Sequence, residues 1–414
     1  MREETASRAA GRVGGGFPGP GPPSYAAGMQ EQRQTALERA WQRVVDREAQ
    51  RIREAFIQGQ GRPAPARPAF AYALAALVLL GYVLVAALGA WLVVWGFGWW
   101  GTGPSNGPRL TFALILAAPL LGYVALAFPR PQVPPGRVVT AEQAPEFHRL
   151  IGEVAAQLGV KAPERVQLDG DVNAFMGRAG LPPRPVLGLG LPLWYGLPAQ
   201  ERVAILAHEL AHQRNGDPAR GSLIWAALTM LAQAVQVLTP DGLGSGVPLV
   251  PYLLLALRLL PLGLYAALVS AIGAEQQTAE YRADLMAAQV AGSDAAAGAL
   301  DKLHLSQALE SALHKQRHMP ERPHAFLELR HIWDTVPDAQ RQQKREEYAA
   351  RRARLDDSHP ATVDRLQVVR AFPQPPALVL DEAWSARIDA ELTPFVKPLE
   401  QQAFEAYQER YAAW

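Results

Sequence analysis

The sequence predicts a mainly α-helical membrane protein with an α+β domain outside the bilayer. Two apolar runs without charged residues, 70–100 and 110–128, approach or exceed the roughly 20 residues that a helix needs to cross a bilayer. Between 129 and 221, short apolar stretches are interrupted by Gly and Pro, which indicates strands and turns. Residues 274–414 are charged and mostly helical in pattern, so the domain outside the membrane combines strands with helices.

Composition excludes several classes of function and site. The formal net charge of the 414 residues is +1, which gives no basis for binding nucleic acid. The chain has no cysteine, and this excludes disulfides, thiolate metal sites and a cysteine nucleophile. Any metal ion must therefore be held by His, Asp or Glu side chains.

The chain divides into five segments. Residues 1–34 are rich in Gly, Pro and Ser and are expected to be disordered. From Thr35 the apolar residues fall on one helix face, which predicts an amphipathic helix packed on the protein itself, on a membrane surface or on a partner. The predicted boundaries are 1–69 for this N-terminal segment, 70–128 for a transmembrane hairpin, 129–221 for the first part of the outer domain, 222–273 for a second apolar hairpin, and 274–414 for the rest of the domain with a helical extension.

The first apolar hairpin has the features of a membrane anchor. Trp91, Trp95, Trp99 and Trp100 gather at the end of its first run, as aromatic residues do at a membrane interface. This run is too long, and begins too far into the chain, for a cleaved signal peptide. The alternative is a helical hairpin buried inside a soluble protein.

The second apolar stretch, 222–273, contains polar Gln233 and charged Arg258. Its helices therefore either cross the bilayer or lie partly immersed in it beside the outer domain. Four arginines between 51 and 67 precede the first span, whereas Arg109 is the one charge in the following loop. By the positive-inside rule, the N-terminus and the outer domain face the cytoplasm. Because Arg and Ala are abundant and Lys is rare, we expect a multi-pass protein of the bacterial inner membrane.

The motif His-Glu-x-x-His occurs at 208–212, within the stretch AHELAHQRNGD. Pro198 suits the first turn of a helix, and His208 and His212 then lie one turn apart on the same face. That is the spacing of two ligands of a tetrahedral zinc ion. Glu209 lies about 100° around the helix, close enough to reach a metal-bound water. A surface helix with solvated histidines is the alternative, and the apolar neighbours of the motif argue against it.

A third ligand must come from another segment, and AEYRADLMAAQ at 279–289 is the candidate. Glu280 and Asp284 lie four residues apart and share a helix face. Glu280 could ligate zinc, and Asp284 could accept the second N–H of a ligating histidine. Periodicity alone leaves Glu275 as a rival ligand, and a solvated helix face as the structural alternative.

These residues resemble a known family. LAHELAHQRNGD, followed by EYRAD after an apolar interval, is similar to the membrane-bound zinc metalloproteases of the HtpX and CAAX prenyl protease family, which are gluzincins. VNAF at 172–175, VLGLGLPLWYGLPAQE, and SHPATVDRL at 358–366 resemble further motifs of that family. The resemblance covers roughly 140–370 and implies a mainly α membrane protein with an α+β zincin-type metalloprotease domain and transmembrane helices. It also selects Glu280 over Glu275.

The resemblance implies a site and a mechanism. One Zn²⁺ per chain is held by His208, His212 and Glu280, and Glu209 is the general base that takes the proton of the attacking water. By resemblance to the C-terminal motif, His359 is the expected donor to the oxyanion. A simple turn before a helix is the alternative for His359.

Three further residues have expected roles. Asp284 supports a ligating histidine, and Asn173 is expected to bind the substrate backbone from an edge strand, with a structural turn as its alternative. Arg365 is expected to help at the substrate or to anchor the site. The chain departs from simpler members of the family in its N-terminal extension, in an Arg- and Gln-rich insert at 312–352, and after Pro376.

The expected activity is hydrolysis of peptide bonds in protein or peptide substrates, including membrane proteins, with the lipid bilayer as surroundings and no nucleic-acid partner. A role in quality control or processing of membrane proteins is implied by the resemblance alone. The alternative from another class is a zinc-binding membrane scaffold without turnover. Glu209 argues against the scaffold, because a scaffold needs no general base.

Overall fold

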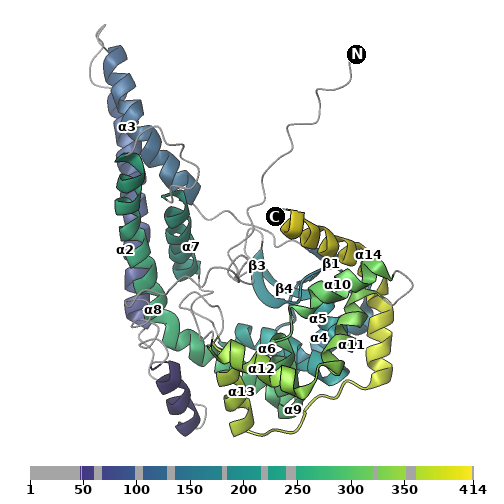
Figure 1. Cartoon of the computed structure of the whole chain (residues 1–414). Helices are drawn as coiled ribbons and strands as arrows, with labels where there is room; N and C mark the ends of the chain where they lie inside the picture. Colours follow the sequence, from purple (N-terminus) through teal and green to yellow (C-terminus); the bar gives the residue numbers. More distant parts are fainter. Residues whose placement is uncertain are drawn as a thin grey trace, which may run out of the picture.

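A bundle of apolar helices projects from a largely helical domain that contains one small sheet (Figure 1). This arrangement comes from a computed structural model, and it confirms the predicted fold class. Predictions for His359 and for residues 1–34 lie outside the residues that the structure describes. Those described residues are 47, 49–59, 68–97, 106–127, 136–179, 184–215, 222–238, 249–319, 324–350 and 360–412.

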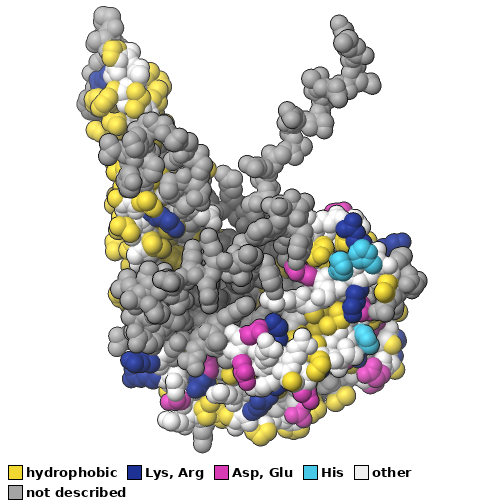
Figure 2. All heavy atoms as spheres, viewed as in Figure 1, with side chains coloured by type: hydrophobic (Ala, Val, Ile, Leu, Met, Phe, Trp, Pro, Cys, Tyr) yellow, Lys and Arg dark blue, Asp and Glu magenta, His cyan; other side chains and the backbone are white. Residues whose placement is uncertain are grey.

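The projecting bundle consists of four helices whose small buried residues allow close packing. Within the described residues, three stretches are long and apolar enough to cross a membrane, namely Ala69–Gly96, Gly107–Leu126 and Leu253–Gly273, whereas Leu223–Val237 is shorter. Apolar side chains cover the outer surface of the bundle, while charged side chains gather on the domain below it (Figure 2). The bundle helices are α2 (Pro68–Gly96), α3 (Asn106–Ala127), α7 (Ser222–Val237) and the first part of α8 (Leu249–Ala291).

Helix α8 is continuous over 43 residues and joins the bundle to the domain (Figure 1). Its first half contains the apolar span Leu253–Gly273, and its second half carries Glu280 and Asp284. The boundary predicted between 273 and 274 therefore falls inside one helix. Neither Gly nor Pro occurs between Ala274 and Ala291, so the backbone hydrogen bonds run on into the charged part of the sequence.

The sheet has the strand order β1-β2-β4-β3, in which β2 and β4 are parallel and the outer pairs are antiparallel. Its strands β2 and β4 form where apolar stretches between Gly and Pro predicted them. β3 is an edge strand, and it lies beside the helix that carries the His-Glu-x-x-His motif. The strands are β1 (Arg137–Val139), β2 (Arg165–Asp169), β3 (Ala174–Ala179) and β4 (Arg184–Gly190).

Helix α6 (Ala199–Asn215) runs through the middle of the domain, and every residue from 202 to 212 is buried. It packs against α4, α8, α9 and β3. The segments before and after the second hairpin thus share one core. The surrounding helices are α4 (Pro145–Leu158), α5 (Leu191–Gly196), α9 (Ser293–Leu303), α10 (Ala308–His318), α11 (Ala325–Thr335), α12 (Asp338–Ala350), α13 (Thr362–Ala371) and α14 (Glu382–Ala412).

The described part of the N-terminal amphipathic helix packs on the protein itself. Phe56 is fully buried against Tyr281 of α8 and Val368 of α13. Arg53 forms an ion pair with Asp364, also on α13. The sequence left three surfaces open for this helix, namely the protein itself, a membrane or a partner. Its described residues pack on the protein itself.

Gly190 offers a test of how closely β4 and the loop before β3 approach each other. A methyl group there would overlap the backbone carbonyl of Asp171, which cannot retract as a flexible side chain could. We expect Gly190→Ala to lower the free energy of unfolding by about 3 kcal/mol or more. Gly152, inside α4, is the control, because a methyl group there meets no atom of the described residues within 4 Å.

The control substitution should change the free energy of unfolding in the opposite direction. Gly152→Ala is expected to raise stability by about 0.5–1 kcal/mol, since Ala favours the helix. Thermal unfolding of the purified protein in detergent measures both. Equal stability of the two variants would contradict the close approach at Gly190.

Candidate active site

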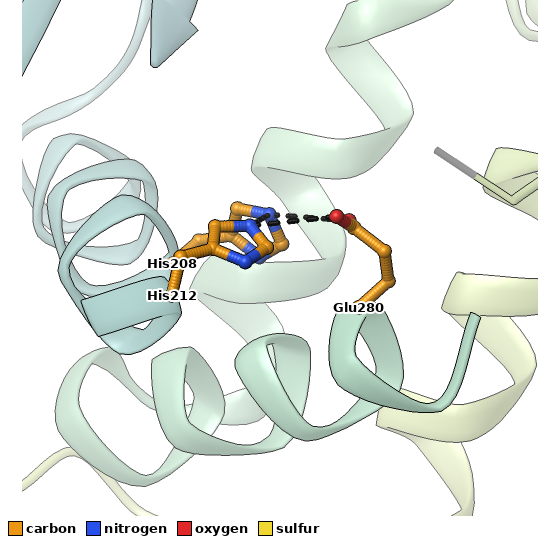
Figure 3. Close-up of side chains that lie close together, drawn as sticks. All are labelled: His208, His212 and Glu280. Carbon is orange, nitrogen blue, oxygen red and sulfur yellow. Dashed lines mark hydrogen bonds and ion pairs between the residues drawn. The ribbon is translucent and has the colours of Figure 1, made fainter. Parts of the chain in front are cut away.

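Five of the predicted site residues come from two helices, α6 and α8, that meet inside the domain (Figure 3). Helix α6 carries His208, Glu209 and His212, and α8 carries Glu280 and Asp284. The two imidazoles and the Glu280 carboxylate point toward one another (Figure 3). All five side chains are buried, so each polar group must find a partner inside the protein.

The geometry of three donor atoms fits a metal ion. His208 Nε2 and His212 Nε2 are 3.2 Å apart, and each lies 3.5 Å from an oxygen of Glu280. Ligands at zinc distances of about 2.0–2.1 Å in a tetrahedron lie roughly 3.3 Å from one another. Among the described residues, these three form the one group of His, Asp and Glu with the spacing of a metal site, and Glu275 is not part of it.

Glu209 is buried beside this group, with 5% of its surface exposed. No hydrogen-bond donor among the described residues reaches its Oε2 atom. A buried carboxylate oxygen without a donor is costly, and such atoms are rare unless water, an ion or a ligand satisfies them. The Oε2 atom of Glu209 is thus held at the site without a donor among the described residues.

Asp284 and Arg365 form a buried pair beside His208, and Arg365 Nη2 also lies 3.8 Å from an oxygen of Glu280. Arg365, on α13, donates from Nε and Nη2 to the two carboxylate oxygens of Asp284 at 2.8 and 2.7 Å. Asp284 Oδ1 lies 3.0 Å from His208 Nδ1, the ring nitrogen that faces away from the metal-site group. Burial raises the pKa of Asp284, but Arg365 and His208 outweigh it, and the net pKa lies below its usual range.

The carboxylates favour positive charge at His208. Burial and the nearby Arg365 guanidinium lower the pKa of His208, but hydrogen bonds to Asp284 and Glu280 outweigh both and raise it to about 9. A proton or a divalent cation would each meet this preference for positive charge. The donor set of two imidazoles and one carboxylate is one that zinc commonly takes.

A cavity of about 130 Å³ opens onto the site. It brings together five of the predicted residues, because Asn173, His208, Glu209, Asp284 and Arg365 all line it. Most of the other lining residues are apolar and come from α5, α6, α8 and α9: Leu193, Ala204, Ile205, Ala287, Ala296, Ala299, Leu300 and Leu303.

Asn173 lies directly before the edge strand β3, and its side chain is exposed. Its backbone carbonyl accepts a hydrogen bond from the N–H of Gly190 at 2.7 Å, which ties the start of β3 to the end of β4. Arg365, by contrast, is 5% exposed and engaged by Asp284. Its geometry favours the anchoring role over direct contact with a substrate.

Sequence reasoning missed a contact behind the site. Asp364 and Tyr281 neighbour Arg365 and Glu280 in the chain, and both bind the N-terminal helix, Asp364 through Arg53 and Tyr281 through Phe56. The apolar face of that helix was visible in the sequence, but its partner was not. A contact between residues more than 200 positions apart leaves no local pattern.

Residues 141–372, more than half of the chain, match Peptidase family M48. The chain belongs to this family. A Protease HtpX homolog of Leptothrix cholodnii is 28% identical over 241 residues, which cover 53% of this chain and 80% of that protein. A Protease HtpX homolog of Pyrococcus abyssi is 30% identical over 240 residues, covering 53% and 76%. Protease HtpX of Xanthomonas oryzae pv. oryzae is 26% identical over 247 residues, covering 57% and 76%.

No solved structure matches this chain. Membership of family M48 and the three apolar helices make this chain a membrane-associated metalloprotease, and they confirm the predicted resemblance. The family also implies a metal cofactor, and the His208, His212 and Glu280 group could hold one. The alternative of a scaffold without turnover gains no support.

Substitution of Arg365 tests how much its ion pair with Asp284 stabilises the folded protein. Arg365→Leu should lower the free energy of unfolding by about 3–5 kcal/mol, because the buried Asp284 carboxylate loses its guanidinium partner. Arg365→Lys should recover only part of this loss, since an ammonium cannot donate as a planar fork to both oxygens. Thermal unfolding in detergent is the measurement, and an unchanged midpoint for Arg365→Leu would contradict the pairing.

Proposed function

We propose that this M48 member is a zinc endopeptidase in which His208, His212 and Glu280 hold one Zn²⁺ ion and Glu209 is the general base. The observation that carries the proposal is the spacing of the three buried donor atoms, 3.2 and 3.5 Å, beside a carboxylate oxygen with no donor among the described residues. When bound, zinc supplies a Lewis acid that polarises the scissile carbonyl and lowers the pKa of water to about 7.

The chain's own residues then carry the proton. Glu209 lines the cavity next to His208, where it can accept a proton from the attacking water and deliver it to the leaving amine. Asp284, held by Arg365, keeps the His208 ring oriented through Nδ1, so that Nε2 faces His212 and Glu280, the residues that would hold the metal with it. Burial of the site excludes bulk water from these transfers.

Two further roles complete the proposal. Asn173 precedes the edge strand β3 and lines the cavity, which supports a role in holding the backbone of an extended substrate. His359 is proposed as the oxyanion donor on the basis of its motif alone. It lies six positions before Arg365 in the sequence.

The proposed substrates are proteins or peptides, with membrane proteins among them. Helix α8 supports this, because one continuous helix carries both an apolar span and Glu280, which keeps the site close to the bilayer. The arginine distribution supports a domain facing the cytoplasm from a bacterial inner membrane. We further propose quality control or processing of membrane proteins as the biological role.

The choice of third ligand is tested by metal content. Glu280→Ala should lose zinc and casein cleavage together, because two imidazoles alone bind zinc much more weakly. Glu275→Ala is the matched control, being the same substitution one and a half turns earlier on α8 and outside the metal-site group. Zinc retained in Glu280→Ala and lost in Glu275→Ala would overturn the assignment.

The same preparation tests the general base. Glu209→Gln should keep one zinc per chain while cleavage falls by a factor of at least about 100, since the amide cannot accept the proton. Metal content by elemental analysis and peptide cleavage by chromatography are the two readouts. Cleavage at the wild-type rate would remove Glu209 from the mechanism.

The cavity also predicts a side-chain preference. Its wall contains Ala204, Ala287, Ala296 and Ala299, so it can accept a branched or aromatic apolar side chain next to the scissile bond. Ala299→Leu should fill this space and lower kcat/KM for peptides with Leu or Phe at that position by about 10- to 200-fold. Peptides with Ala there should be affected little.

The control for this substitution is Ala156→Leu, the same change at an exposed position of α4 that does not line the cavity. It should leave the preference unchanged. A uniform loss of kcat/KM for large and small side chains in Ala299→Leu would mean that the cavity does not select the substrate.

A further inference from the structure

We propose that the C-terminal helix α14 holds the active-site helix α6 in position, and that Asp389 is the positioning residue through which it acts. Helix α14 (Glu382–Ala412) lies wholly beyond residues 141–372, the part that matches family M48. It runs along the outside of the domain (Figure 1, yellow). The inference rests on the proposed function, because it assumes that α6 carries two metal ligands.

A buried charge on α6 binds α14. Arg202 lies six residues before His208 and is 2% exposed. It donates from Nη1 to the Asp389 carboxylate at 2.7 Å and to the Ser385 hydroxyl at 2.9 Å, and from Nε to the carbonyl of Leu197 at 2.9 Å. A guanidinium that is removed from water needs such a partner, and α14 supplies its carboxylate.

Asp389 also holds the helix that leads into α6. Its carboxylate accepts a second hydrogen bond from Trp194 Nε1 at 2.8 Å, and its backbone carbonyl accepts one from the Tyr195 hydroxyl at 3.0 Å. The Arg202 guanidinium lies over the Trp194 ring, 4.7 Å from its centroid. One residue of α14 therefore joins α5 and the first turn of α6.

A second contact fixes the same turn from the segment before α14. Gln200 donates to the carbonyls of Leu378 and Ala291 at 2.8 Å, and its oxygen accepts a hydrogen bond from the N–H of Leu380 at 3.1 Å. Ala291 is the last residue of α8, the helix that carries Glu280. Gln200 thus ties the start of α6 to both the C-terminal segment and the end of α8.

One face of helix α14 packs into the domain core. Its carboxylates also bind the first N–H groups of two other helices, since Glu391 accepts from Glu146 and Phe147 of α4, and Glu400 accepts from Ala325 of α11. One apolar stripe of α14 lies in the same core as α6, and it consists of Trp384, Ile388, Leu392, Val396, Leu399 and Ala403.

These contacts bear on the metal site because a helix moves as a rigid body. A small rotation or shift of α6 would carry His208 and His212 away from Glu280, which sits on a different helix. Metal affinity depends on donor positions to within a few tenths of an ångström, and catalysis is comparably sensitive. Holding the first turn of α6 at Arg202 therefore holds the imidazoles as well.

The test compares two carboxylates of α14 in the full-length protein in detergent. Asp389→Ala should lower zinc affinity by about 10-fold or more, as loss of supporting contacts does at metal sites, and lower kcat with it. Glu391→Ala removes the cap of α4 and should lower thermal stability while leaving zinc affinity unchanged. Competition between the protein and a chromogenic zinc chelator measures the affinity, and Asp389→Glu should restore part of it.

Asp389→Ala could fail to fold because Arg202 is left buried without its carboxylate. The double variant Arg202→Met with Asp389→Leu removes both charges and should fold, since replacing an ion pair that has a buried guanidinium with apolar side chains is often neutral or stabilising. This double variant also lacks the hydrogen bond from Arg202 to Leu197 and the one from Trp194 to Asp389. Zinc affinity and kcat should therefore stay below wild type, and wild-type values of both would overturn the inference.

The outcomes separate this inference from the proposed function. Wild-type protein that binds no zinc would overturn the proposed function, and the inference with it. Wild-type protein that binds zinc, with Asp389→Ala or the folded double variant binding it equally well, would overturn the inference alone. Loss of zinc affinity in the Asp389 variants but not in Glu391→Ala supports it.

Discussion

The domain depends on placing several charged side chains together where water does not reach. His208, Glu209, Glu280, Asp284 and Arg365 are each at most 6% exposed and lie between α6, α8 and α13. Burying any one of them alone would be costly, so four of them pair with one another, while Glu209 Oε2 finds no donor among the described residues. Three helices from distant parts of the chain must therefore be held in one arrangement, and the contacts around them serve that requirement.

Continuity of α8 connects this arrangement to the bilayer. The same helix contains an apolar span and, beyond it, two residues less than one turn apart. Tyr281 faces the N-terminal helix, and Asp284 faces the site. The N-terminal helix packs against α8 and α13, and α14 binds the first turn of α6. Segments on both sides of the part that matches family M48 thus contribute to the structure around the site.

Much of the site could be predicted from local pattern, and some of it could not. The spacing of His208 and His212 is a property of one helix, so sequence alone indicated that both face one way. Periodicity left Glu275 as a rival to Glu280, and in the sequence only the resemblance separated them; in the structure Glu280 is the one grouped with the two histidines. Arg365 was expected at the substrate or as an anchor, and its distances of 2.7 and 2.8 Å to Asp284 favour the anchor.

By itself, the sequence determined the apolar spans, the helix with two histidines on one face and the absence of thiolate ligands, because each follows from neighbours in the chain. Only the tertiary structure decided that Glu280 meets those histidines at 3.5 Å, that Asp364 meets Arg53, and that Asp389 meets Arg202. Such pairs join residues that are tens to hundreds of positions apart. Their contact depends on how whole helices pack, which no short stretch of sequence encodes.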